Sequence, residues 1–134
     1  MRIFLDTNVL VSAFASRGLC ADLFELILLE HELVVGAQVL AELRRALRQK
    51  IKLPAARCDE IDEFLREHGG ILVESAPQVI AAVDDDDARV LGQAIAGAAD
   101  VFVTGDAAIQ QVAKIEQMRV LSPRAFWNSL RSRA

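Results

Sequence analysis

The chain is 134 residues long, 53% of its residues are hydrophobic, and its formal net charge is −4. This size and apolar content fit one globular domain over residues 1–134, which needs neither disulfides nor a structural zinc to bury a core. No apolar run approaches the ~18 residues of a membrane span and no leader pattern opens the sequence, which favours a cytoplasmic protein without a membrane partner.

The first half of the chain alternates short apolar runs with segments of helical period. Residues 3–5 and 33–35 are short apolar runs and are expected to form buried strands. Residues 9–14 are expected to begin a helix, and residues 23–28 repeat apolar side chains at helical spacing. Residues 39–47 do so again after the second strand, so these helices should each pack one face on the sheet.

The second half continues the same alternation. Pro54 is expected to open a helix that Gly69-Gly70 closes, followed by a strand at residues 71–73. A helix follows the acidic run at 84–87, and a strand at 101–103 leads into a shorter helix over 107–115. A last strand at 120–121 precedes a terminal helix capped by Ser122. The alternation predicts an α/β fold with a parallel sheet.

Aspartates follow two of the expected strands. Asp6 directly follows the first strand, and Asp106 follows the strand at 101–103 after Thr104-Gly105. Each could simply cap the next helix, which is a common role for aspartate. Because ligands bind at the carboxyl ends of the strands in open parallel sheets, the repeated pattern instead favours one shared crevice.

Further acids are expected near the same edge. Glu42 lies in an apolar stretch of the helix after the second strand, where an ordinary partner within the helix is the simpler role. The run at residues 84–87 precedes a helix, whose dipole needs only one or two carboxylates, so the excess suggests a bound cation. Asp87 is favoured as the ligand because apolar residues lie three, four and seven positions after it, which places it on or beside the buried face of the helix. Asp84 remains the alternative.

These acids would form a ligand set made only of oxygen, which suits Mg²⁺ or Mn²⁺ rather than zinc. The only histidines are His31 and His68, both expected at helix ends, and no serine or cysteine nucleophile has a plausible partner. Two divalent ions can activate water against a phosphodiester. If four carboxylates bind metal, 15 acids remain against 15 Lys and Arg, so the acidic balance does not exclude a nucleic-acid substrate.

Together these residues resemble the PIN domain family. The resemblance runs in order through Leu5-Asp6-Thr7-Asn8, Glu42, the acidic run and Thr104-Gly105-Asp106. It implies an α/β fold in the form of a three-layer α/β/α sandwich with a five-stranded parallel sheet, and a Mg²⁺- or Mn²⁺-dependent nuclease that cuts RNA. It also implies an acidic quartet of Asp6, Glu42, Asp87 and Asp106, with Asn8 and Thr104 as supporting residues. The long acidic run leaves Asp84 as a possible alternative to Asp87.

The form of the chain is similar to VapC-like toxins, which implies a homodimer and a cognate antitoxin protein as partner. Arg44, Arg45 and Arg48 are candidates to bind the RNA backbone, although a solvated helix face explains them equally well.

Other functions compete with this interpretation. A PIN-fold nuclease outside a toxin-antitoxin pair could process RNA or cut DNA with the same acids, and a non-cleaving module could bind RNA or protein. A phosphatase of the haloacid-dehalogenase type also places an aspartate after its first strand. It requires a second aspartate two positions later, where this chain has Asn8.

Overall fold

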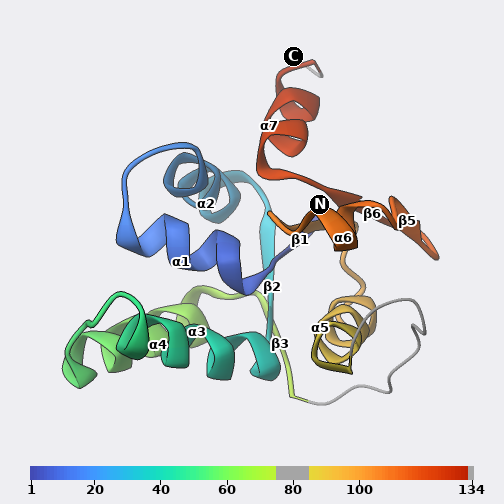
Figure 1. Cartoon of the computed structure of the whole chain (residues 1–134). Helices are drawn as coiled ribbons and strands as arrows, with labels where there is room; N and C mark the ends of the chain where they lie inside the picture. Colours follow the sequence, from blue (N-terminus) through green and yellow to red (C-terminus); the bar gives the residue numbers. More distant parts are fainter. Residues whose placement is uncertain (75–84, 133–134) are drawn as a thin grey trace.

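A six-stranded, mostly parallel sheet forms the centre of the computed structural model, which describes residues 1–74 and 85–132 (Figure 1). The strand order is β3-β2-β1-β4-β6-β5. The strands are β1 (Arg2–Leu5), β2 (Glu32–Gly36), β3 (Ile71–Val73), β4 (Val101–Val103), β5 (Lys114–Ile115) and β6 (Met118–Leu121). All neighbouring strands pair in parallel except β5 and β6, which pair antiparallel.

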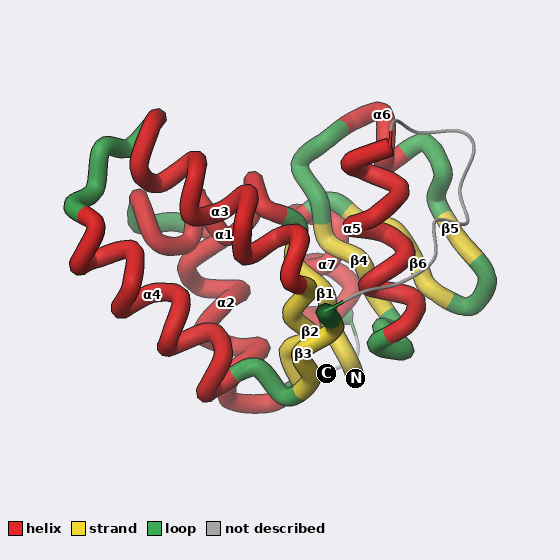
Figure 2. Tube along the Cα trace, turned by 90° about the horizontal axis from the view of Figure 1, so that it is seen from below, coloured by secondary structure: helices red, strands yellow, loops and turns green. Residues whose placement is uncertain are grey.

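Helices cover both faces of this sheet, as an α/β sandwich requires. They are α1 (Thr7–Ala15), α2 (Leu19–Glu30), α3 (Ala37–Gln49), α4 (Ala55–His68), α5 (Asp85–Ala96), α6 (Ala107–Gln110) and α7 (Pro123–Arg131). Helices α1 to α4 lie on one side of strands β1 to β3 and α5 lies on the other, in both views (Figures 1 and 2). The predicted α/β/α architecture is therefore confirmed.

The core explains why β1 and β4 occupy the centre. Strands buried on both faces are apolar throughout, and Val101, Phe102 and Val103 are all buried. The rings of Phe4 and Phe102 stack across the two strands with centroids 5.3 Å apart. This packing fixes the two strands side by side, in a register that sets Leu5 against Val103.

The order of the strands reverses between β1 and β4. In the sheet, β2 and β3 lie on the far side of β1, whereas β6 and β5 lie on the far side of β4. Chain connections therefore leave these two neighbouring strands in opposite directions, and it is at the carboxyl ends of such strands that open parallel sheets bind their ligands. Asp6 and Thr104 are the first residues beyond the two strands, so they lie together at this edge of the sheet.

The sequence prediction of a five-stranded sheet and of a helix over residues 107–115 was wrong. The helix α6 ends at Gln110, and residues 114–115 form the short strand β5. Ala113 has a φ of 61°, a left-handed conformation that prevents the helix from continuing. Alanine rarely adopts this conformation, so the sequence does not predict it. The chain then turns through Glu116, with a φ of 53°, so that β5 pairs back on β6 as an antiparallel sixth strand.

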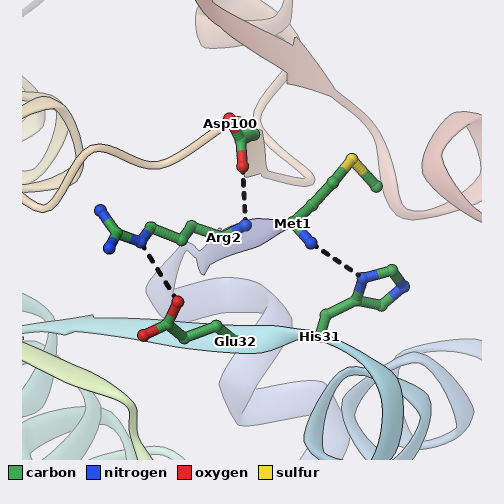
Figure 3. A network of polar contacts seen from close by, with 5 residues as sticks. All are labelled: Met1, Arg2, His31, Glu32 and Asp100. Carbon is green, nitrogen blue, oxygen red and sulfur yellow. Dashed lines mark hydrogen bonds and ion pairs between the residues drawn. The ribbon is translucent and has the colours of Figure 1, made fainter.

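Polar contacts hold the opposite, amino-terminal edge of the sheet (Figure 3). The backbone N–H of Arg2 donates to Asp100 Oδ2 at 2.7 Å, and its guanidinium pairs with Glu32 at 3.2 Å. The amino group of Met1 lies 3.5 Å from His31 Nδ1. These contacts join β1 to β2 and to the start of β4, at the edge of the sheet opposite Asp6 and Asp106. None of the described helices is long and apolar enough to cross a membrane.

Candidate active site

Asp6 directly follows β1 at the carboxyl edge of the sheet and is 7% exposed. Its Oδ1 accepts from the backbone N–H of Thr7 at 2.8 Å, so it does cap α1, as the simpler interpretation of the sequence expects. Its Oδ2 accepts from the hydroxyl of Thr104 at 2.7 Å and from the amide of Asn8 at 3.2 Å. The cap therefore accounts for only one of the three hydrogen bonds.

Asp106 is tied to the same network through the turn after β4. The hydroxyl of Thr104, which is fully buried, accepts from the backbone N–H of Asp106 at 3.0 Å while donating to Asp6. The side-chain oxygen of Asn8 accepts from the backbone N–H of Gly105 at 2.9 Å. Thr104 and Asn8, the two expected supporting residues, thus join the turn after β1 to the turn after β4.

Glu42 lies on α3, which packs against both α1 and α5. Its Oε1 accepts from the hydroxyl of Thr7 at 2.8 Å, and its Oε2 accepts from the amide of Gln38 at 3.0 Å. Both oxygens are therefore held in place by neutral donors. Thr7 contacts Asp6 through its backbone and Glu42 through its side chain, so it fixes the two acids relative to each other.

The pKa of Asp6 reflects both its burial and the two acids near it. Burial raises the pKa of Asp6, and the nearby carboxylates of Glu42 and Asp106 raise it further. The hydrogen bonds from Thr104 and Thr7 act in the opposite direction without cancelling the rise. Among residues 1–74 and 85–132, no lysine or arginine forms an ion pair with any of the three acids.

The three acids retain acceptor capacity for a cation. An ionised carboxylate offers about four lone-pair positions, and the three donors to Asp6 leave one. Asp106 uses Oδ1 to cap α6 through Ala108 at 2.8 Å and through Ile109 at 3.4 Å. Its Oδ2 accepts no hydrogen bond from the described part of the chain. Oxygen donors with uncompensated charge fit Mg²⁺ or Mn²⁺.

The described residues do not by themselves form a closed metal site. Within them, no three His, Cys, Asp or Glu side chains are gathered closely enough to hold an ion. Asp87 is half-buried in the first turn of α5, a helix that packs against α3. Its carboxylate remains a predicted ligand. Asp84, the alternative to Asp87, lies outside the described residues.

The three candidate RNA-binding arginines differ in their surroundings. Arg44 pairs with Asp59 of α4 at 2.7 Å, and this contact raises the pKa of its guanidinium. Arg48 donates to the carbonyl oxygen of Leu53 at 2.9 Å. Arg45 is exposed and contacts no carboxylate of the described chain. It lies three positions after Glu42, on the adjoining part of the helix surface.

Sequence reasoning missed three residues that organise the site, namely Thr7, Gln38 and Gln93. Gln38 precedes Glu42 by four positions, a spacing that allows a side-chain contact and could have identified it. Gln93 is buried and contacts the start of α3, but it is 55 positions from Gln38, so no local pattern indicates the contact.

Comparison with known proteins places the fold. A family model described as PIN domain matches residues 2–108. No curated protein matches the sequence. One similar solved structure is VapBC2 from Rickettsia felis bound to a DNA fragment from its promoter. A chain of it is 19% identical to this one with a TM-score of 0.63, and the match covers 91% of this chain and 98% of that one. FitAcB from Neisseria gonorrhoeae is 21% identical with a TM-score of 0.59 and the same coverages. DNA-bound VapBC from Salmonella typhimurium is 15% identical with a TM-score of 0.61, covering 92% of this chain and 98% of that one.

Proposed function

Because the chain belongs to the PIN domain family, we propose that it is a divalent-metal-dependent endoribonuclease. The observation that supports this most strongly is the buried carboxylate of Asp6, which has Glu42 and Asp106 beside it and only neutral hydrogen-bond donors around it. Buried charges are normally paired or bound to metal. A divalent cation would offset the mutual repulsion of these acids.

In this proposal, Asp6, Glu42 and Asp106 hold Mg²⁺ or Mn²⁺, with Asp87 as the fourth acid and Asp84 as its alternative. When bound, such ions lower the pKa of a water molecule and neutralise charge on the phosphate. Thr104 and Asn8 orient the carboxylate of Asp6, while Thr7 and Gln38 orient that of Glu42. In this proposal the chain holds the carboxylates of Asp6 and Glu42 in fixed orientations before substrate arrives.

Arg45 is the arginine best suited to contact the RNA backbone, because it is exposed and lies near Glu42 along α3. Arg44 and Arg48 are already engaged with Asp59 and with the backbone of Leu53, so they instead connect α3 to its surroundings. A contact between Arg45 and a phosphate would strengthen the binding of RNA of any sequence, because phosphates carry no base information.

We also propose that the protein is the toxin of a toxin-antitoxin pair, acting in the cytoplasm as a homodimer with an antitoxin protein as partner. Support comes from the resemblance to VapC-like toxins and from VapBC assemblies that share the fold. Induction of the protein in cells should arrest growth, and co-expression of the product of an adjacent gene should restore it. Normal growth after induction of the active wild type would reject the toxin role.

The nuclease proposal is tested with labelled RNA and pure protein. We expect cleavage with Mg²⁺ or Mn²⁺, none with EDTA, and a loss of about 100-fold or more for Asp6→Asn, because this change removes the central charge. Single-stranded DNA of the same sequence, assayed in parallel, separates a ribonuclease from a DNA nuclease. Equal cleavage by wild type and Asp6→Asn would reject the site, and binding without cleavage would favour a non-cleaving module.

A further inference from the structure

Gln93 is a buried polar residue that connects three elements around the site. Its side chain is 5% exposed and lies on α5, six positions after Asp87. The amide nitrogen donates to the carbonyl oxygen of Glu74, just after β3, at 3.2 Å. The amide oxygen accepts from the backbone N–H of Gln38 at 3.0 Å. One side chain thus ties α5 to the end of β3 and to the first turn of α3.

The contact with Gln38 supplies a helix cap that α3 lacks. The first four N–H groups of a helix have no acceptor within it, and an N-cap side chain usually provides one. The N-cap residue of α3 is Gly36, which has no side chain to do so. Gln93 occupies that role from another helix. It can approach only because position 36 is glycine, since a Cβ there would overlap the amide oxygen of Gln93.

The same contact leads to Glu42. Gln38, whose backbone is held by Gln93, donates from its side chain to Glu42 Oε2 at 3.0 Å. We propose that Gln93 is a positioning residue that fixes the start of α3, and through Gln38 the carboxylate of Glu42, relative to α5. This inference rests on the proposed function only in so far as Glu42 belongs to the metal site.

Amide hydrogen exchange tests the cap without any metal or substrate. Because Gln38 lies in the first turn of α3, the protection of its N–H has to come from Gln93. Gln93→Met keeps length and volume but removes the acceptor, so exchange at Gln38 should accelerate by about fivefold or more. Gln93→Glu keeps an oxygen acceptor and should retain the protection. Gly36→Ala, which displaces Gln93 from the other side, should reproduce the loss.

Mn²⁺ binding, measured by calorimetry, tests the connection to Glu42. Gln93→Met should weaken binding by about fivefold or more, whereas Ile27→Val, a mildly destabilising change in the fully buried part of α2, should leave it unchanged. Equal Mn²⁺ affinity in Gln93→Met and wild type would overturn the positioning role, and so would unchanged exchange at Gln38. If the wild type binds no Mn²⁺, the proposed function fails, and the exchange at Gln38 alone decides the role of Gln93.

Discussion

Replacing Thr104 by valine tests whether its hydroxyl holds the site together. The change preserves shape but removes the donor to Asp6 Oδ2 and the acceptor for the N–H of Asp106. A hydrogen bond to a charged group contributes about 1.5–3 kcal/mol and a neutral one about 0.5–1.5 kcal/mol. We therefore expect Thr104→Val to lower the free energy of unfolding by about 2–4.5 kcal/mol.

This loss of free energy corresponds to a decrease in the melting temperature. With an unfolding entropy of about 2.1 cal/mol/K per residue, the 134 residues give about 0.28 kcal/mol/K. Thr104→Val should thus melt about 7–16 °C below wild type in calorimetry with EDTA present. Thr104→Ser keeps the hydroxyl and loses only a methyl group, at about 0.8 kcal/mol or about 3 °C.

The pH dependence of this difference gives a sharper test. The pKa of Asp6 in the folded protein is raised above its ordinary value of 3.8, chiefly by burial. The stabilisation of the folded protein that this raised pKa implies is fully present below pH 3.8 and is lost as the pH rises through the pKa of the folded state. Removing the Thr104 hydrogen bond raises that pKa further, so the valine variant should lose stability over a wider pH range. The gap between the valine and serine variants should shrink in acid. Equal melting of the two variants at neutral pH would refute the reasoning.

Three further predictions follow from the same geometry. Mg²⁺ should raise the melting temperature of wild type but not of Asp6→Asn, because the proposed metal site requires the Asp6 carboxylate. An equal rise in both would place the ion elsewhere. Arg45→Gln should weaken RNA binding and lower the slope of log K against log salt concentration by about 1, the value of one phosphate contact. Arg44→Gln should mainly break the exposed pair with Asp59. Filter binding at several salt concentrations compares them, and a larger effect of Arg44 would contradict the assignment. Leu29 is 77% exposed, so Leu29→Glu should leave the fold of the monomer intact in circular dichroism while dissociating a dimer built on α2. Light scattering that shows a dimer in both proteins would exclude that face.

Local pattern was sufficient to predict most of the fold. Five apolar runs correctly predicted the parallel strands, and Pro54, Gly69 and Ser122 marked helix ends because their backbone preferences and capping groups act locally. The end of α6 was missed because Ile109, Val112 and Ile115 recur every three positions, as apolar residues on one helix face can. The left-handed Ala113 that ends the helical pattern carries no local signal.

The candidate site was only partly predictable for a related reason. Asp6 and Asp106 stood out because each follows a buried strand, and the sheet order then brings both turns together. The hydrogen bonds that hold Glu42 come from Thr7 and Gln38, and the cap on α3 comes from Gln93. Contacts such as Gln93 with Gln38 depend on how separate helices pack, which helical period alone does not specify.

The pairing of β1 with β4 also has a consequence for synthesis of the chain. Asp6 is made first, but Thr104, which holds its carboxylate, follows 98 positions later. An unfinished chain therefore carries the central acid without its partner strand, its supporting hydroxyl or Asp106. The proposed site assembles only after residue 106 has left the ribosome, so under the proposed ribonuclease function a growing chain that ends before this point would be unable to cut the message that encodes it.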